Sequence, residues 1–205
     1  MSNKKPYFPF FMDISNAKGI IIGGGKQAYE KILRMQPFGP ELTLIASEWI
    51  PEIEMIEGVN FLKSDYMVLD ILQTADFVIV ADSEEEVKRR ISKYCKERRI
   101  PVNVVDEEAY SSYTYSAMVT KGALSIGIST AGTSPSIAVL LKEEINAWIP
   151  SAMDEILDWL EEIRPFIKEK ILDKEMRKKV LCQIAKTAME KGDILTKEEM
   201  DHIIS

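Results

Sequence analysis

A glycine-rich turn near the start of the chain has the residue types and the spacing that bind a dinucleotide. The apolar run Ile20–Ile22 is followed by Gly23, Gly24 and Gly25, and a helical pattern begins directly after them. Gly23, Gly25 and Ala28 fit the pattern G-x-G-x-x-G/A, in which the backbone approaches a pyrophosphate at the N-terminus of a helix. Since glycine-rich turns also occur without a ligand, the motif by itself leaves a purely structural turn open.

Polar residues after a second apolar run favour one form of the cofactor. Ser47 and Glu48 follow the run 41–46, about 20 residues after the glycine turn, where a dinucleotide fold meets the adenosine ribose. Neither residue is a cation that could accommodate a 2′-phosphate, so the sequence favours NAD over NADP. The alternative for Glu48 is a solvated loop residue without a ligand.

Asp106, directly after the apolar run 101–105, is the main catalytic candidate. A carboxylate at the end of a strand can take or deliver a proton beside a bound nicotinamide. In an open parallel sheet, ligands bind beyond the carboxyl ends of the strands, so we expect Asp106 to share one crevice with the glycine turn and Glu48. The alternative role for Asp106 is to cap the turn or helix that follows it.

A further candidate segment is the predicted helix start at Ser134, where Ser134 caps the helix and Pro135 occupies its first position. The N–H groups at such a start suit an acidic ligand, and Thr130 and Thr133 add hydroxyl groups next to it. Ordinary helix capping explains Ser134 equally well.

The first half of the chain carries alternating strand and helix patterns that must position these residues. They predict strands at 18–23, 41–46, 59–63, 76–81 and 101–105 and helices at 26–36 and 84–98. Apolar strands that alternate with helices indicate a parallel sheet covered by helices on both faces, which is the Rossmann-like α/β class.

After Asp106 the apolar pattern changes to a period of two residues. It runs through Tyr113–Val119 and Leu124–Ile128, on either side of Lys121-Gly122, and predicts an antiparallel hairpin. An isolated hairpin is marginally stable, so we expect it either to complete the first sheet or to pair with a second copy of the chain.

From Pro150 onward the chain carries helical patterns only. The first apolar stripe is expected to be interrupted at Arg164-Pro165, and Thr196–Glu199 is a capping box that opens a final short helix. We expect three parts, which are an NAD-binding Rossmann-like domain at 1–112, a dimerisation hairpin and helix at 113–150, and a helical C-terminal domain at 151–205.

Composition and charge exclude several functional classes. A chain of 205 residues with a net charge of −7 is not expected to bind nucleic acid. No apolar run is long enough to span a membrane, so we expect a cytoplasmic location and no membrane partner. Cys95 and Cys182 lack metal-binding spacing, and the single histidine, His202, lies near the C-terminus, so no metal site is expected.

Four segments occur in the order that is typical of one known family. They are Tyr7–Asp13, Ile21–Gly25, Pro101–Asp106 and Ile126–Pro135, and with them the chain resembles precorrin-2 dehydrogenase over residues 7–150. That family is the NAD-dependent dehydrogenase module of siroheme synthase.

The resemblance implies oxidation of precorrin-2 to sirohydrochlorin with NAD as hydride acceptor and, in some members, insertion of ferrous iron. Asp106 matches an aspartate implicated in both activities, and Thr130 matches a hydroxyl residue of the substrate region. Members of the family form homodimers through the segment after the nucleotide domain, which would give the hairpin its partner. The expected cofactor-binding residues are Gly23, Gly24, Gly25, Lys26, Gln27, Ser47, Glu48 and Ala81, and the expected substrate-binding residues are Thr130, Thr133 and Ser134.

Five positions depart from the pattern of the family, namely Glu30, Asp82, Lys88, Ser116 and Ala131. They concern the cofactor contacts near Asp82 and the fit of the substrate near Ser116. The departures motivate an alternative in which the chain is a non-catalytic NAD(H)-binding sensor or scaffold. A structural domain without a ligand is the third alternative.

The net negative charge sets a requirement for binding such a substrate. Because precorrin-2 carries many carboxylates, an acidic chain needs positive groups close to the binding site. The sequence offers Lys121, Lys142 and the helix start at Ser134 for this purpose.

Overall fold

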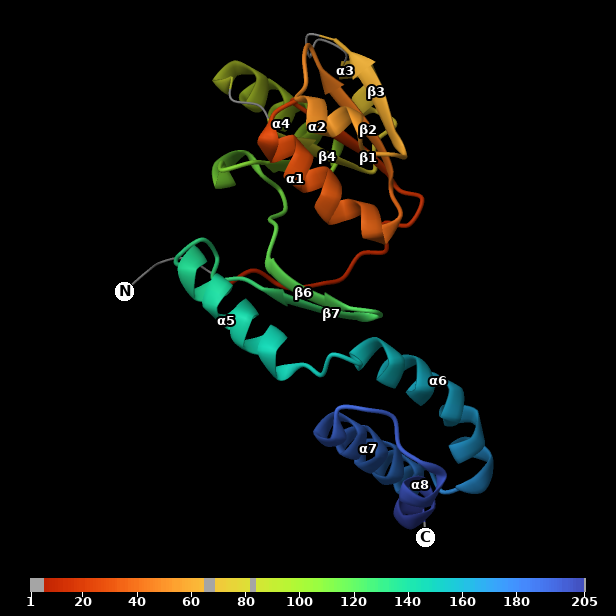
Figure 1. Cartoon of the computed structure of the whole chain (residues 1–205). Helices are drawn as coiled ribbons and strands as arrows, with labels where there is room; N and C mark the ends of the chain where they lie inside the picture. Colours follow the sequence, from red (N-terminus) through yellow and green to blue (C-terminus); the bar gives the residue numbers. More distant parts are fainter. Residues whose placement is uncertain (1–5, 65–68, 82–83, 205) are drawn as a thin grey trace. The chain divides into compact units, whose positions relative to one another are not determined.

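The computed structural model describes residues 6–64, 69–81 and 84–204, and these residues form two compact units (Figure 1). The first, which we call the sheet unit, comprises Phe10–Tyr115. The second, which we call the helical unit, comprises Ser116–Ser205 together with the N-terminal residues before Phe10. We describe each unit by itself.

The sheet unit alternates strands and helices along the chain. Its five strands are all parallel and lie in the order β3-β2-β1-β4-β5. The elements are β1 Lys18–Ile22, α1 Lys26–Met35, η1 Gln36–Phe38, β2 Glu41–Ala46, α2 Pro51–Glu54, β3 Val59–Lys63, α3 Leu69–Leu72, β4 Phe77–Val80, α4 Glu85–Arg98, β5 Val102–Val104 and η2 Glu108–Tyr110. The predicted parallel sheet with flanking helices is therefore confirmed.

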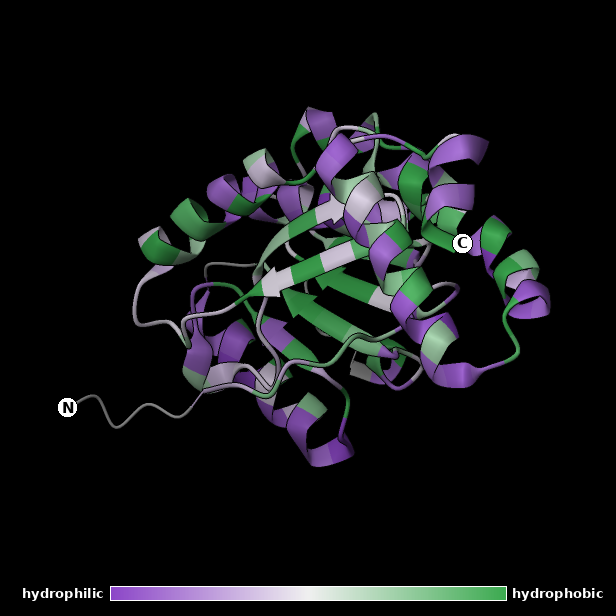
Figure 2. Cartoon of the chain, turned by 90° about the horizontal axis from the view of Figure 1, so that it is seen from below, coloured by the Kyte–Doolittle hydropathy of each residue, from purple (hydrophilic) through white to green (hydrophobic). Residues whose placement is uncertain are grey.

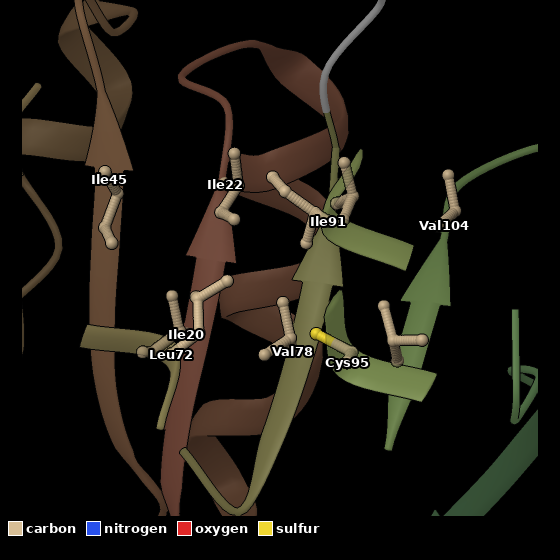
Figure 3. Packing of buried hydrophobic residues seen from close by; sticks show 10 residues of the cluster. Ile20, Ile22, Ile45, Leu72, Val78, Ile91, Cys95 and Val104 are labelled. Carbon is tan, nitrogen blue, oxygen red and sulfur yellow. The ribbon is translucent and has the colours of Figure 1, made fainter. Parts of the chain in front are cut away.

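The central strands are buried on both faces because successive side chains of a strand point to opposite sides. Ile20 and Ile22 of β1 join a core with Ile91 and Cys95 of α4 on one face (Figure 3). On the other face, Ile21 belongs to a second core that includes the buried residues Ala28, Ile32 and Met35 of α1. Helices therefore cover both faces, which explains why the sequence of β1 is uniformly apolar rather than alternating.

The sheet extends from β1 in two directions, so the strand order reverses there. From β1 the chain proceeds to β2 and β3 on one side, and then crosses to β4 and β5 on the other. In a doubly wound sheet, such a reversal leaves a crevice at the carboxyl ends of the two strands, where ligands bind. The ends of β1 and β4 are thus the place where a site is expected.

The helical unit begins with an antiparallel hairpin formed by β6 Ala117–Lys121 and β7 Leu124–Ile128. Gly122 makes its turn with φ +51°, a conformation that residues with a Cβ rarely adopt. The hairpin was predicted to start at Tyr113, but its first strand starts at Ala117. Tyr113 and Tyr115 instead pack against each other within the sheet unit, with ring centroids 5.8 Å apart.

Four helices complete this unit, namely α5 Pro135–Trp148, α6 Met153–Lys170, α7 Lys174–Lys191 and α8 Lys197–Ile204. The helices carry hydrophilic and hydrophobic residues side by side (Figure 2), as expected for helices with one packed and one solvated face. The predicted capping box is confirmed, because the Thr196 N–H donates to Glu199 and the Glu199 N–H donates to Oγ1 of Thr196. Within the described ranges, no helix is long and apolar enough to cross a membrane.

The predicted interruption at Arg164-Pro165 is wrong, since α6 runs through Pro165. A proline inside a helix removes one backbone hydrogen bond and costs about 3 kcal/mol. Ile156 and Ile167, on either side of it, are both buried in the core formed with α7. Burying each of these side chains contributes about 1.5–3 kcal/mol, so tertiary packing outweighs the proline.

Candidate functional site

The absence of a side chain has a different structural consequence at each of the three glycines after β1. Gly23 has φ +109°, which only glycine adopts without strain, and its N–H donates to the Ile45 carbonyl at 3.0 Å. A Cβ on Gly24 would lie 2.0 Å from the Glu48 carbonyl oxygen. A Cβ on Gly25 would meet nothing within 4 Å, so the backbone there faces open space. The backbone of the turn thus packs against the protein at Gly24 and is open to a ligand at Gly25.

The helix that follows the turn begins without a side-chain cap. Gly25 is the N-cap residue, and the first turn of α1 holds no acidic residue. The first helical hydrogen bond runs from the Tyr29 N–H to the Gly25 carbonyl at 3.1 Å. The N–H groups of the three residues before Tyr29 therefore have no carbonyl acceptor within the helix. Together with the helix dipole, they suit a phosphate group placed at Gly25.

The strand ends on either side of the glycine turn are tied to it by backbone hydrogen bonds. Ser47 and Glu48 follow β2 and are both exposed, and the loop continues through the bond from the Ile50 N–H to the Gly24 carbonyl at 2.9 Å. On the other side, the N–H of the buried Ala81 donates to the Ile22 carbonyl at 2.7 Å. The structure therefore brings these predicted cofactor residues together at adjacent carboxyl ends.

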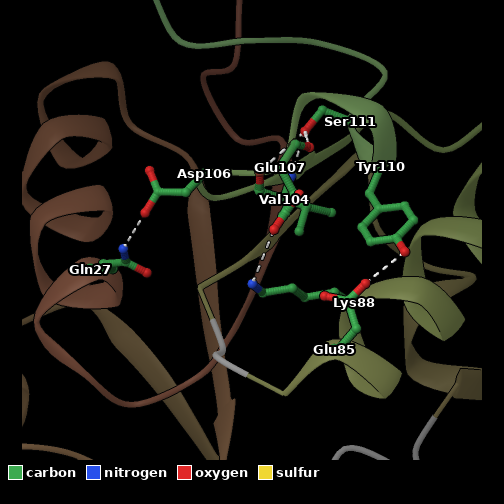
Figure 4. A network of polar contacts seen from close by, with 8 residues as sticks. All are labelled: Gln27, Glu85, Lys88, Val104, Asp106, Glu107, Tyr110 and Ser111. Atoms are coloured by element: carbon green, nitrogen blue, oxygen red, sulfur yellow. Dashed lines mark hydrogen bonds and ion pairs between the residues drawn. The ribbon is translucent and has the colours of Figure 1, made fainter.

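Asp106 reaches the same region from the end of β5. Its Oδ2 accepts a hydrogen bond of 2.8 Å from Nε2 of Gln27, in the first turn of α1 (Figure 4). The residue has φ +62°, a left-handed conformation that aspartate and asparagine adopt more readily than most other residues. Glu107, rather than Asp106, precedes the short helix η2, and no side chain caps that helix. Asp106 is therefore not the cap of the helix that follows it.

The segment around Asp106 is anchored to α4 and β5. Lys88, whose side chain is only 13% exposed, lies 3.8 Å from the Glu107 carboxylate. Ser111 Oγ accepts from the Val104 N–H at 2.8 Å, and the Tyr110 hydroxyl donates to Glu85 at 2.7 Å (Figure 4). This last bond is the main cause that raises the pKa of Tyr110 above its usual value. The network holds the backbone of the loop that carries Asp106.

Two of the departures from the family pattern have structural partners in this unit. Glu30 lies 4.0 Å from Lys26 one helical turn before it, and both side chains are largely exposed, so the pair contributes little. Lys88 has the partly buried ion pair with Glu107 described above. Asp82 lies outside the described residues.

Sequence reasoning missed a basic cluster on α1. The Lys31 ammonium lies 4.2 Å from the centroid of the Tyr115 ring, and the Arg34 guanidinium carbon lies 5.3 Å from it. Burial is the main cause that lowers the pKa of both Lys31 and Arg34, and burial also raises the pKa of Tyr115 to about 12. The signal that could have found the cluster is the spacing of Gln27, Lys31 and Arg34, which places them on one helix face.

The predicted substrate residues lie in the helical unit, where they bond to one another. Ser134 is the N-cap of α5, and its Oγ accepts from the Ile137 N–H at 3.3 Å. Thr130 Oγ1 donates to the Ser134 carbonyl at 3.0 Å, and the Thr133 hydroxyl donates to the Thr130 carbonyl. The predicted helix start is confirmed, and all three hydroxyl groups take part in the loop that precedes α5. Ala131 adopts φ +49° within this loop.

In the part of the chain that the structure describes, no group of three or more His, Cys, Asp or Glu side chains is placed to hold a metal ion.

Comparison with known proteins yields two family matches. Residues 10–117 match the family described as "Putative NAD(P)-binding", and residues 121–147 match the family described as "Sirohaem biosynthesis protein central". The first match covers the sheet unit with its glycine turn and Asp106. The second covers most of the hairpin and nearly all of α5.

Among curated relatives, the siroheme synthase of Thioalkalivibrio sulfidiphilus is 28% identical over 176 residues, covering 84% of this chain and 36% of that protein. The siroheme synthase of Neisseria meningitidis serogroup C is 25% identical over 168 residues, covering 80% of this chain and 35% of that protein. The chain thus spans about a third of the length of the relatives it matches. A solved structure of "SirC, precorrin-2 dehydrogenase" superposes with a TM-score of 0.74 at 21% identity and covers 97% of each chain, so the two share a fold.

Proposed function

The chain belongs to the NAD(P)-binding family that it matches over residues 10–117, and from this premise we propose that it is an NAD-dependent precorrin-2 dehydrogenase of siroheme biosynthesis. The matched sirohaem biosynthesis segment and the similarity to siroheme synthases support the choice of substrate. The observation that carries the proposal is the placement of the Asp106 carboxylate against Gln27, next to a glycine turn that is open at Gly25.

The residues present fit a dinucleotide. The open backbone at Gly25 and the uncapped start of α1 suit the diphosphate, with Gly23, Gly24, Lys26 and Gln27 completing the turn. Glu48 and Ser47, exposed after β2, are suited to hydrogen-bond the ribose hydroxyls, and an acidic residue there disfavours a 2′-phosphate. We therefore propose NAD rather than NADP, with Ala81 lining the end of β4.

NAD, when bound, accepts a hydride. Oxidation of the substrate by loss of a hydride also releases a proton, and the exposed Asp106 carboxylate is the group that we propose to accept it. Gln27 holds Oδ2 of this carboxylate at 2.8 Å and so fixes its orientation. Oδ1 accepts no hydrogen bond within the described part of the chain and is left for the substrate.

We propose Thr130, Thr133 and Ser134 as contacts of the substrate. Their hydroxyl groups are engaged in the loop before α5, Pro135 has no N–H, and the Ile137 N–H donates to Ser134, so the Ser136 N–H is the first-turn donor that suits a carboxylate. Ferrous iron is proposed as a second substrate, because a carboxylate such as Asp106 can also take one of the two protons that the macrocycle loses when a metal ion enters, while the other passes to solvent.

A homodimer is proposed through the hairpin and α5. Large apolar side chains of α5 are exposed within a single chain, and exposed apolar patches of this kind mark association surfaces. They are Ile137, Val139, Leu140, Leu141 and Trp148. Sedimentation equilibrium tests this point, since a monomer at micromolar concentration would contradict it. We place the enzyme in the cytoplasm, consistent with its two free cysteines.

The test of the proposed function is an assay of the purified chain with precorrin-2 and either NAD or NADP. We expect the absorption spectrum of sirohydrochlorin to appear together with NADH, and a much lower rate with NADP. Parallel reactions with ferrous iron report insertion of the metal. Tight binding of NADH without any turnover would instead support the alternative of an NAD(H)-binding sensor or scaffold.

A further inference from the structure

The face of α1 that carries Gln27 beside Asp106 also carries two basic residues, to which the proton transfer proposed above gives no role. Gln27, Lys31 and Arg34 are spaced by four and then three residues, so they project from one face of the helix. The adjacent face of α1, with Ala28, Ile32 and Met35 one position further along the chain, is buried in the core of the sheet unit. This basic face therefore borders the packed side of the helix, and its two basic side chains are half-buried.

The segment that follows β5 covers this face. Gln27 donates to Asp106 at the start of that segment, and Tyr115 at its end lies against both Lys31 and Arg34. The Tyr115 hydroxyl is 2.9 Å from the Met35 sulfur, which fixes its ring on the helix. Two cations and one carboxylate are thus brought to one side of α1 by contacts on the same segment.

Lys31 is half-buried and lies close to a second cation, Arg34. Burial is the main cause that lowers the pKa of Lys31, the repulsion of Arg34 adds to it, and the attraction of Asp106 and Glu30 opposes the two only in part. Within the ranges that the structure describes, Lys31 forms no ion pair. Half-buried cations that lie close together gain stability when an anion joins them, since the anion offsets both the desolvation and the repulsion.

The anion is distinct from the diphosphate of the cofactor. Phosphate binds at the N–H groups of the first helical turn, at Gly25 and Lys26. Lys31 lies five residues further along α1, which is about 7.5 Å at a rise of 1.5 Å per residue. A second anionic group, next to the proton acceptor Asp106, is the ligand that this position suits, and a carboxylate side chain of the substrate has that chemistry.

We propose that Lys31 and Arg34 bind a peripheral carboxylate of a carboxylate-rich tetrapyrrole and thereby place its ring beside Asp106. This inference rests on the proposed function for its substrate class. Lys31 and Arg34 supply the local positive charge that an acidic chain requires. This charge then lies in the sheet unit and not at Lys121 or Lys142. Lys31 acts in binding, while Asp106 remains the group that takes the proton.

The experiment measures binding of uroporphyrin, a stable tetrapyrrole with a carboxylate on every side chain, by quenching of its fluorescence in the absence of turnover. Lys31→Met and Arg34→Met retain much of the side-chain volume and remove the charge, whereas Lys31→Arg retains the charge. The matched control is Lys93→Met on α4, whose side chain is 75% exposed. NADH affinity and thermal unfolding of each variant are measured alongside.

We expect uroporphyrin to bind about ten- to a hundredfold more weakly to Lys31→Met and Arg34→Met, which corresponds to the loss of one charge-assisted hydrogen bond. Lys31→Arg recovers most of the affinity, Lys93→Met binds like the unaltered chain, and NADH affinity stays the same in all four variants. Coproporphyrin, with fewer carboxylates, should bind more weakly to the unaltered chain and lose less in the variants.

Equal uroporphyrin affinity in Lys31→Met and the unaltered chain would overturn the inference, as would absence of binding by the unaltered chain. A large loss of NADH affinity in a folded Lys31→Met would also overturn it, because the lysine would then serve the cofactor. Failure to oxidise precorrin-2 while uroporphyrin binding depends on Lys31 would contradict the proposed function alone.

Discussion

The side-chain amide of Gln27 donates a 2.8 Å hydrogen bond to the carboxylate of Asp106, and this bond joins the first turn of α1 to the end of β5. The two residues are 79 positions apart in the chain. Because β5 is the edge strand and α1 follows the central strand β1, the bond spans the crevice where the sheet order reverses. A proton acceptor is thereby fixed next to the turn that suits a dinucleotide.

Substitution of Asp106 tests its assignment as the proton acceptor. Asp106→Asn keeps the shape of the side chain and tolerates φ +62°, so the loop should fold as before. Removing a positioned general base lowers kcat by about 10²–10⁴-fold, while NADH affinity should change little. The measurement is the steady-state rate of sirohydrochlorin formation, with fluorescence of Trp49, next to the glycine turn, as the check on cofactor binding. Undiminished turnover would remove Asp106 from the mechanism.

Gly24 and Gly25 of the glycine turn should respond differently to substitution by alanine. Gly24→Ala places a Cβ 2.0 Å from a backbone oxygen and 2.6 Å from the Trp49 Cα, so the chain must shift. We expect a loss of about 1–3 kcal/mol in the free energy of unfolding, measured by urea denaturation, together with loss of NADH binding.

Gly25→Ala is the matched control, because its Cβ meets no protein atom within 4 Å and its φ of −89° suits alanine. Its stability should change by less than about 0.5 kcal/mol. The same Cβ enters the space assigned to the diphosphate, so NADH affinity should still fall about tenfold or more. If Gly25→Ala bound NADH normally, the diphosphate could not lie against this turn.

The sequence predicted most of the elements that depend on local interactions. The strand 59–63, the cap at Ser134 and the capping box at Thr196 were confirmed because their signals lie within a few neighbouring residues. The Asp106 site could be anticipated only in outline. Its strand end was visible, but the bond to Gln27 depends on the order in which the strands pack.

Features set by tertiary packing were not predicted. Pro165 reads as a helix breaker, yet Ile156 and Ile167 keep α6 continuous through burial. Tyr115 fits an alternating strand pattern, but it packs on Lys31 of α1 instead. The basic cluster escaped notice because lysine and arginine on a helix are usually solvated, and only the fold shows which of them become half-buried.

Ala131 is strained, and this predicts that glycine at the same position stabilises the chain. The residue has φ +49°, and a left-handed conformation costs an L-residue about 1–2 kcal/mol. Glycine removes this cost but loses about 0.4–1 kcal/mol through the greater freedom of the unfolded chain. Ala131→Gly should therefore raise the free energy of unfolding by up to about 1.6 kcal/mol.

The reverse substitution in the hairpin provides the comparison. Gly122→Ala should destabilise, since its φ is +51° and a Cβ there would lie 2.6 Å from the Asp154 Cβ. The stability of both variants is measured by urea denaturation, and the curves are fitted with one common m-value, which is the slope of the free energy of unfolding against urea concentration. A lower stability of Ala131→Gly would show that the loop before α5 is not strained.

The capping box at the start of α8 predicts a pH dependence of stability. Hydrogen bonds from the Lys191 ammonium and the Thr196 N–H lower the pKa of Glu199 from its usual value. A carboxyl whose pKa is lowered by folding stabilises the protein above its unfolded pKa and loses that contribution as the pH falls through the folded value. Thermal unfolding should thus occur at a lower temperature in Glu199→Gln than in the unaltered chain at pH 7, and the difference should disappear in acid. The exposed Glu198→Gln serves as the control and should show no such difference. The unfolding temperatures of Glu199→Gln and the unaltered chain could instead differ by the same amount in acid as at pH 7. The difference would then come from the packing of α8 and not from the charge of Glu199.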